Sequence, residues 1–132
     1  MRYLLDTNVL SDLVRNPQGP SARRLAEVGD KFVCTSVIVA AELWYGAAKR
    51  NSQRLTAQLE AILAAIEIVA IESPVERVYG RLRARLERDG QPIGGNDLLI
   101  AAQSISLGLT LVTDDEREFS RIVELPCENW VR

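Results

Sequence analysis

Four acidic residues stand where the sequence predicts that strands end or helices begin. Asp6 and Asp115 each follow a short apolar run, Glu42 lies early in a predicted helix, and Asp97 opens an almost uniformly apolar one. A lone aspartate before a helix is commonly an N-cap. Four carboxylates gathered at one place raise one another's pKa unless a cation lies among them. Oxygen ligands favour Mg²⁺ or Mn²⁺ over zinc, so the pattern indicates a site for a hard divalent cation.

Short apolar runs alternate with helical patterns along the chain. We expect strands at 3–5, 32–35, 68–71 and 109–112, with a further edge strand near the C-terminus, and helices at 8–14, 21–29, 37–50, 52–66, 74–89, 98–107 and 115–119. Strands separated by helices imply right-handed crossovers and a parallel sheet covered on both faces. The sequence therefore predicts a three-layer α/β/α sandwich with a central parallel sheet of four to five strands, forming one domain over residues 1–132. Ligands of such sheets collect at the carboxyl ends of the strands.

Small polar residues mark the expected helix starts. Ser21, Ser36 and Asn96 are predicted N-caps, and Ser73 with Glu76 has the spacing of a capping box with proline at the first helical position between them. Asn51 or Ser52 is expected to cap the helix over residues 52–66. If Asn96 supplies the cap, the aspartate that follows it is free for another role.

Composition restricts the chemistry. The chain has no histidine, which excludes imidazole catalysis and histidine-ligated zinc. Its net charge is -2, so any nucleic-acid contact must be local. The two cysteines, Cys34 and Cys127, lack metal-ligand spacing and are expected to be reduced thiols without a role. No apolar run approaches the roughly 20 residues of a membrane span, and no signal-peptide core precedes Asp6, so we expect a cytoplasmic protein.

Several segments form a pattern that covers nearly the whole chain. They read LDTNVL at 5–10, AEL at 41–43 with glycine at 46, IGGNDLLIAA at 93–102, LVT at 111–113, REF at 117–119 and ENW at 128–130. In this pattern the chain resembles the PIN-domain ribonucleases, specifically the VapC-type toxins of bacterial type II toxin-antitoxin systems. The resemblance implies a PIN-like fold, Mg²⁺ (with Mn²⁺ able to substitute) on Asp6 and Asp97, and Glu42 completing the cluster. Many similar toxins have asparagines after the last threonine, where this chain has Asp114 and Asp115, and we favour Asp115 as the fourth acid.

The acids indicate a mechanism, and the resemblance implies a substrate class and partners. Metal held by these acids would lower the pKa of a water, and the resulting hydroxide would attack the phosphate in line, leaving a 5′-phosphate and a 3′-hydroxyl. Thr7, Asn8 and Thr113 either orient ligands or serve only as turn and cap groups, and the sequence leaves both readings open. The expected substrate is structured RNA such as tRNA. The expected partners are a VapB-type antitoxin and a second copy of the chain, in a homodimer and a toxin-antitoxin hetero-oligomer.

Two sets of side chains are candidates for these contacts. Arg77, Arg81 and Arg85 lie on one face of a predicted helix and are candidates for RNA phosphates, although interspersed acids favour an ordinary solvated face. Trp44 and Tyr45 are candidate interface anchors, although aromatic residues at helical spacing more often lie in the core.

Other functions are also compatible with clustered acids. A receiver-like phosphotransfer domain would need paired acids near the first strand and a lysine after a late strand, and both lysines lie in the first half of the chain. A haloacid-dehalogenase-type phosphatase would need an aspartate where Asn8 stands. A non-catalytic PIN-like domain that binds RNA or a partner remains the main alternative, although the retained acids weaken it.

Overall fold

The computed structural model describes all of residues 1–132 and contains one five-stranded sheet. The strands are β1 (Tyr3–Leu5), β2 (Val33–Ser36), β3 (Glu67–Val69), β4 (Thr110–Val112) and β5 (Cys127–Glu128). They lie in the order β3-β2-β1-β4-β5, and every neighbouring pair is parallel. The expected parallel sheet is therefore confirmed, with β1 at its centre.

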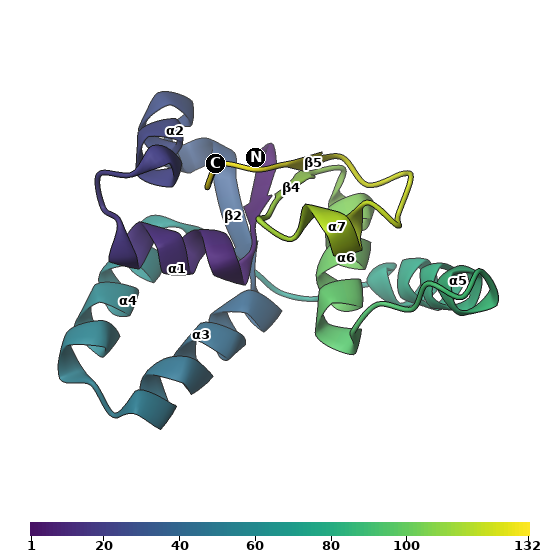
Figure 1. Cartoon of the computed structure of the whole chain (residues 1–132), viewed down its shortest axis with the longest axis horizontal. Coiled ribbons are helices and arrows are strands. Elements are labelled where there is room, and N and C mark those ends of the chain that lie inside the picture. Colours follow the sequence, from purple (N-terminus) through teal and green to yellow (C-terminus); the bar gives the residue numbers. More distant parts are fainter.

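Helices connect the strands and cover the sheet. They are α1 (Thr7–Arg15), α2 (Pro20–Val28), the short 3-10 helix η1 (Asp30–Phe32), α3 (Val37–Arg50), α4 (Gln53–Ala65), α5 (Val75–Arg88), α6 (Gly95–Leu107) and α7 (Glu116–Phe119). Figure 1 shows α1 to α4 to one side of β1 and α5 to α7 to the other, which confirms the expected α/β sandwich. None of these helices combines the length and the apolar character needed to cross a bilayer.

The central strands form the core because their side chains are apolar on both faces. All three residues of β1 are buried, and Leu4, Leu5, Leu111 and Val112 are fully enclosed. Phe119 of α7 is also fully buried and anchors that short helix to the core. This rigid base fixes the positions where β1 and β4 end, and Asp6 and Thr113 are the residues that follow them.

Several predicted helix ends are confirmed. Ser36 caps α3 by accepting the Ile38 N–H at 3.1 Å. Ser52, rather than Asn51, caps α4 by accepting the Leu55 N–H at 3.1 Å. Gly108 ends α6 with φ of 68°, a left-handed conformation that glycine adopts without steric cost.

Three predicted N-caps are wrong, namely Ser21, Ser73 and Asn96. Helix α2 begins at Pro20 with Gly19 as its cap, since proline suits the first helical position, and Ser21 lies buried in the first turn. In α5 the cap is Pro74, whose carbonyl accepts the Val78 N–H at 3.3 Å. The Ser73 hydroxyl donates to the Glu76 carboxylate instead, at 2.6 Å.

The start of α6 was also predicted too late. Gly94 is its N-cap, and the Gly94 carbonyl accepts the Leu98 N–H at 2.9 Å. Asn96 therefore lies within the first turn, as Asp97 does, and caps nothing. The expected strand at 68–71 begins one residue earlier and ends two residues earlier, because Glu67 pairs with Cys34 in the parallel register of β2 and β3.

Candidate metal centre

Asp6 follows β1 and is almost completely buried, with 4% of its surface exposed. Its Oδ1 accepts the Thr7 N–H at 2.8 Å, which makes Asp6 the N-cap of α1. Its Oδ2 accepts the Thr113 hydroxyl at 2.8 Å. Burial raises the pKa of Asp6, while the bonds from Thr113 and Thr7 oppose that change by stabilising the charged form. The side chain is held in one orientation by two separate elements.

Thr7 connects this aspartate to the acid on α3. The Thr7 hydroxyl donates to Glu42 Oε1 at 2.8 Å, while its backbone N–H donates to Asp6. Glu42 lies half-buried in the second turn of α3. A single residue at the start of α1 therefore positions two of the four predicted acids.

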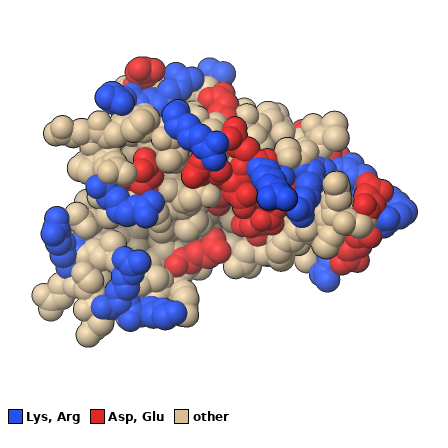
Figure 2. Space-filling view, in the orientation of Figure 1, with Lys and Arg blue, Asp and Glu red and all other residues tan.

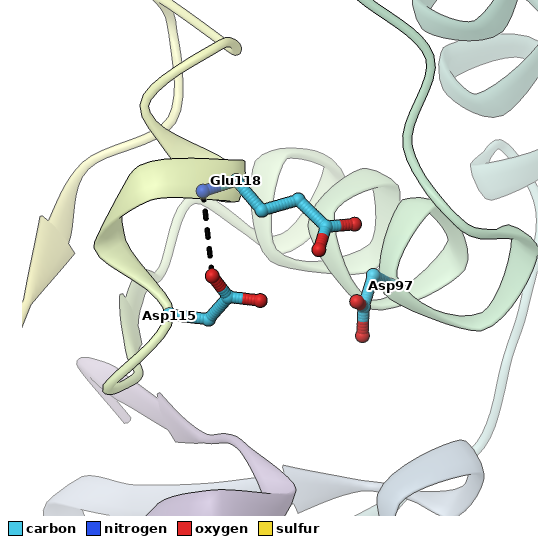
Figure 3. A group of neighbouring side chains, drawn as sticks. All are labelled: Asp97, Asp115 and Glu118. Atoms are coloured by element: carbon cyan, nitrogen blue, oxygen red, sulfur yellow. Dashed lines mark hydrogen bonds between the residues drawn. The ribbon is translucent and has the colours of Figure 1, made fainter.

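Asp97, Asp115 and Glu118 form a second part of the cluster. One carboxylate oxygen from each lies within 4.8 Å of the others, and Figure 3 shows the side chains of Asp97 on α6, Glu118 on α7 and Asp115 just before α7 extending toward a shared space. Asp115 also caps α7, where its Oδ1 accepts the Glu118 N–H at 3.4 Å. This separation is compatible with carboxylates that share one cation.

Electrostatic effects join the two parts. The pKa of Asp97 is raised to about 7, first by burial and then by the negative charges of Glu118, Asp6 and Glu42. The charge of Asp115 in turn raises the pKa of Asp6. Acidic side chains gather in the centre of the face in Figure 2. The structure thus brings the four predicted acids to one edge of the sheet, as their positions after strands and near helix starts indicated.

Glu118 is the acid that the sequence reasoning missed. It lies three residues after Asp115, a spacing that places both side chains on the same side of a helical turn, and the motif resembles a capping box. That spacing was a usable signal. The Glu118 carboxylate also accepts the Gly94 N–H at 3.3 Å, which links α7 to the start of α6.

Asp114 and Asp115 point in different directions. Asp114 Oδ1 accepts hydrogen bonds from Asn129 at 2.9 Å and from Arg132 at 3.3 Å, so this carboxylate faces the C-terminal tail. Asp115 faces Asp97. The geometry supports the preference for Asp115 as the fourth acid.

Thr113 and Asn8 form the centre of the polar network. Besides donating to Asp6, the Thr113 hydroxyl accepts the Asp115 N–H at 3.0 Å and the Asn8 amide at 3.4 Å. Asn8 Oδ1 accepts the Asp114 N–H at 2.9 Å. These bonds fix the loop after β4 against the start of α1. A role of Thr7, Asn8 and Thr113 toward a ligand stays a prediction.

None of the other candidate residues belongs to the acidic cluster. Arg85 binds Glu124 through two hydrogen bonds, of 2.8 and 2.6 Å, so its charge is already neutralised, whereas Arg77 and Arg81 are exposed without an ion pair. The core interpretation of Trp44 and Tyr45 is wrong: these side chains are 37% and 66% exposed, because α3 buries the opposite face.

Both cysteines are free. Burial raises the pKa of Cys34 and of Cys127 to about 11, so each remains a protonated thiol at neutral pH.

The donor set fits a hard divalent cation. Asp97, Asp115 and Glu118 all offer carboxylate oxygens, and burial followed by the negative charges of Glu118, Asp6 and Glu42 raises the pKa of Asp97, an effect that a bound cation would offset. Histidine and thiolate ligands are absent from the cluster, which argues against zinc.

Comparisons with known proteins agree with this geometry. Residues 3–125 match the PIN domain family. The chain is 36% identical to ribonuclease VapC2 of Haemophilus influenzae, with 99% of each chain covered, and 32% identical to the tRNA(fMet)-specific endonuclease VapC of Shigella flexneri, with 98% of each covered. The VapBC2 structure from Rickettsia felis bound to a promoter DNA fragment superposes with a TM-score of 0.90 at 36% identity, covering 98% of this chain and 99% of that one. The chain therefore belongs to the PIN domain family, among its VapC ribonucleases.

Proposed function

We propose that this protein is the toxin endoribonuclease of a toxin-antitoxin system, and that it hydrolyses RNA phosphodiester bonds with Mg²⁺ held by Asp6, Glu42, Asp97 and Asp115. The observation that carries the proposal is the convergence of these acids, from four distant parts of the chain, at the carboxyl edge of the sheet. The relatives named as VapC ribonucleases support the reaction class.

The residues have separate tasks in this reaction. When bound, the cation supplies Lewis acidity that activates a water and offsets charge on the scissile phosphate. Asp6 is a ligand whose charge is stabilised beforehand by the bonds from Thr7 and Thr113. Glu42 is held toward the same space by Thr7. Because the chain lacks histidine, no imidazole takes part in proton transfer.

Magnesium and tRNA are the specific choices within this proposal. An all-carboxylate site of this kind suits Mg²⁺, and Mn²⁺ has similar ligand preferences. The relative from Shigella flexneri is named a tRNA(fMet)-specific endonuclease, so total tRNA is the first substrate to test.

The proposed partner is a small VapB-type antitoxin. Solved neighbours include VapBC complexes from Rickettsia felis and Haemophilus influenzae, the latter with a TM-score of 0.85 at 31% identity and all of each chain covered. We propose a homodimer within a toxin-antitoxin hetero-oligomer. Trp44 and Tyr45 are exposed on α3 and are large enough to anchor such a protein contact.

The decisive experiment compares Asp97→Asn with Asp114→Asn. Both variants remove one carboxylate, but only Asp97 faces the cluster. The wild type should cleave total tRNA with Mg²⁺ or Mn²⁺ and leave 5′-phosphate ends, and EDTA should stop the reaction. Asp97→Asn should lower the rate at least about 100-fold with an unchanged circular dichroism spectrum, because metal-site substitutions commonly cost 10- to 100-fold even one shell further out. Asp114→Asn should retain most activity.

Two results would count against the proposal. Cleavage by Asp97→Asn at the wild-type rate would remove Asp97 from the mechanism. A wild-type protein that binds Mn²⁺ and RNA but leaves the RNA intact would favour the non-catalytic PIN-like alternative.

A further inference from the structure

A groove of about 290 Å³ runs between α1, α3 and α4, next to the acidic cluster. Thr7 at the start of α1 and Glu42 in the second turn of α3, which belong to the network of the cluster, line its near end. Arg15 and Arg50 line it at the last residues of the same two helices. Figure 1 shows both helices starting near the centre of the molecule and running toward the same side.

The spacing along the two helices is the same. Arg15 lies eight residues after Thr7, and Arg50 lies eight residues after Glu42. At a rise of 1.5 Å per residue, each arginine backbone lies ~12 Å along its helix from the residue at the cluster. Two flexible guanidinium groups therefore stand at the far end of a groove whose near end is acidic. Figure 2 shows basic side chains over this region and acidic ones toward the centre.

Neither arginine is neutralised by the protein. Arg15 and Arg50 are exposed and take part in none of the ion pairs of the chain, whereas Arg83 and Arg85 on α5 are each paired with a glutamate. A basic residue at a helix C-terminus is favourable for the helix dipole. The helix dipole explains why each helix ends with an arginine, but it does not explain why both arginines line the same groove.

We propose that this groove is the path of the RNA chain on one side of the cleavage site, with Arg15 and Arg50 contacting phosphates that flank the scissile one. The inference rests on the proposed ribonuclease activity. A polyanion that reaches an acidic cluster needs cations beyond the metal itself, and these are the unpaired cations that share a groove with Glu42. Leu43, Leu55 and Leu59 give the groove apolar walls against which a base can pack. Its volume is near the lower end for small-ligand pockets, which suits a single strand better than a duplex.

The test measures RNA affinity and its salt dependence in the full chain. Arg15→Ala/Arg50→Ala is compared with Arg2→Ala/Lys31→Ala, which removes two exposed cations just before β1 and β2, at the opposite edge of the sheet. Binding of total tRNA is measured over a range of KCl in an Asp97→Asn background, so that the measurement does not depend on cleavage. Steady-state cleavage of total tRNA is then measured for the same arginine and lysine substitutions in a chain that retains Asp97.

The groove variant should bind total tRNA about tenfold or more weakly and raise the apparent KM with little change in kcat. Its slope of log K against log[salt] should be shallower by about 1.4, since each single-strand phosphate contact contributes about 0.7. Arg15→Lys/Arg50→Lys should restore most of the slope, and Arg2→Ala/Lys31→Ala should match the wild type. With Asp97 intact, a Mn²⁺ titration should be the same for the wild type, the groove variants and Arg2→Ala/Lys31→Ala, which separates this effect from damage to the metal site.

Three results would overturn the inference. The first is a groove variant with wild-type affinity and salt slope. The second is a loss of affinity in Arg77→Ala/Arg81→Ala instead, which would assign the RNA path to α5. The third is a groove variant that binds RNA normally but loses the antitoxin, which would make the groove a protein interface. If the wild type cleaves no RNA, the proposed activity fails while the binding slopes still decide the path.

Discussion

Asp97→Asn should make the metal-free protein more stable at pH 8, although it removes a residue of the proposed metal site. The pKa of Asp97 rises from 3.8 to about 7 because the side chain is partly buried beside Glu118, Asp6 and Glu42. A difference of that size corresponds to roughly 4 kcal/mol, at about 1.36 kcal/mol per tenfold change in acidity. The carboxylate is only half-buried, and water screens it, so we expect the substitution to stabilise by about 1–2 kcal/mol.

The sign of the pH dependence follows from proton binding. A raised pKa means that the folded protein binds more protons than the unfolded chain between about pH 4 and pH 7, so the free energy of unfolding falls as the pH rises through that range. Asp97 is neutral in the folded protein below that range, and Asp97→Asn should then match the wild type. Above pH 7 the wild type carries the full cost of a partly buried charge beside other acids, and the amide does not.

Urea unfolding in EDTA at pH 5 and pH 8 measures this difference, which should be smaller at pH 5, inside the titration range, and complete at pH 8. Mg²⁺ should reverse the order of stability at pH 8, because a ligand that binds only the folded state stabilises it by mass action, and Asp97→Asn has lost much of its affinity. Asp114→Asn serves as the control, since Asp114 is bound to the C-terminal tail. If Asp97→Asn is no more stable than the wild type at pH 8 in EDTA, the acids do not repel one another as the structure indicates.

Two further substitutions test the network around the acids. Thr113→Val keeps the side-chain shape but removes the hydroxyl that donates to Asp6, and a hydrogen bond to a charged group is worth about 1.5–3 kcal/mol. Mn²⁺ affinity, measured by titration, should therefore fall about 10- to 100-fold. Unchanged affinity would mean that Thr113 is a packing residue only. Glu118→Gln should weaken Mn²⁺ binding about tenfold and flatten the pH dependence of apo stability, because the Glu118 charge is, after burial, the largest cause of the raised pKa of Asp97. Glu116→Gln, on the same helix but 54% exposed, should leave both measurements unchanged.

The sheet was predictable because its strands are apolar on both faces. Tyr3–Leu5 is a run without polar alternation, as a strand enclosed on both sides requires, and the aspartate after it marks where that strand ends. The same reasoning placed Asp115 after β4. Positions after strands are fixed by the sheet, and this is why the convergence of the acids could be predicted without coordinates.

Helix starts were harder to predict because several local solutions compete. Near residue 95 two glycines and an asparagine are all suitable N-caps for α6. Gly94 is the N-cap, so Asn96 does not have the capping role that asparagine favours. At Ser73 the hydroxyl found a carboxylate partner instead of a backbone N–H. The exposure of Trp44 and Tyr45 was also missed, since helical spacing alone does not say which face of α3 meets the sheet.

In this fold an acid can cap a helix and also belong to the proposed metal site. Asp6 and Asp115 are both N-caps and both members of the cluster, so the hydrogen bonds that begin α1 and α7 also orient the proposed ligands. Replacing either residue with alanine would remove a helix cap worth about 1 kcal/mol together with a carboxylate, and the two losses could not be separated. Asp97 caps nothing, because Gly94 has that role in α6. Loss of cleavage in Asp97→Asn would therefore report on the metal site alone, which makes this residue the sharpest probe of the mechanism.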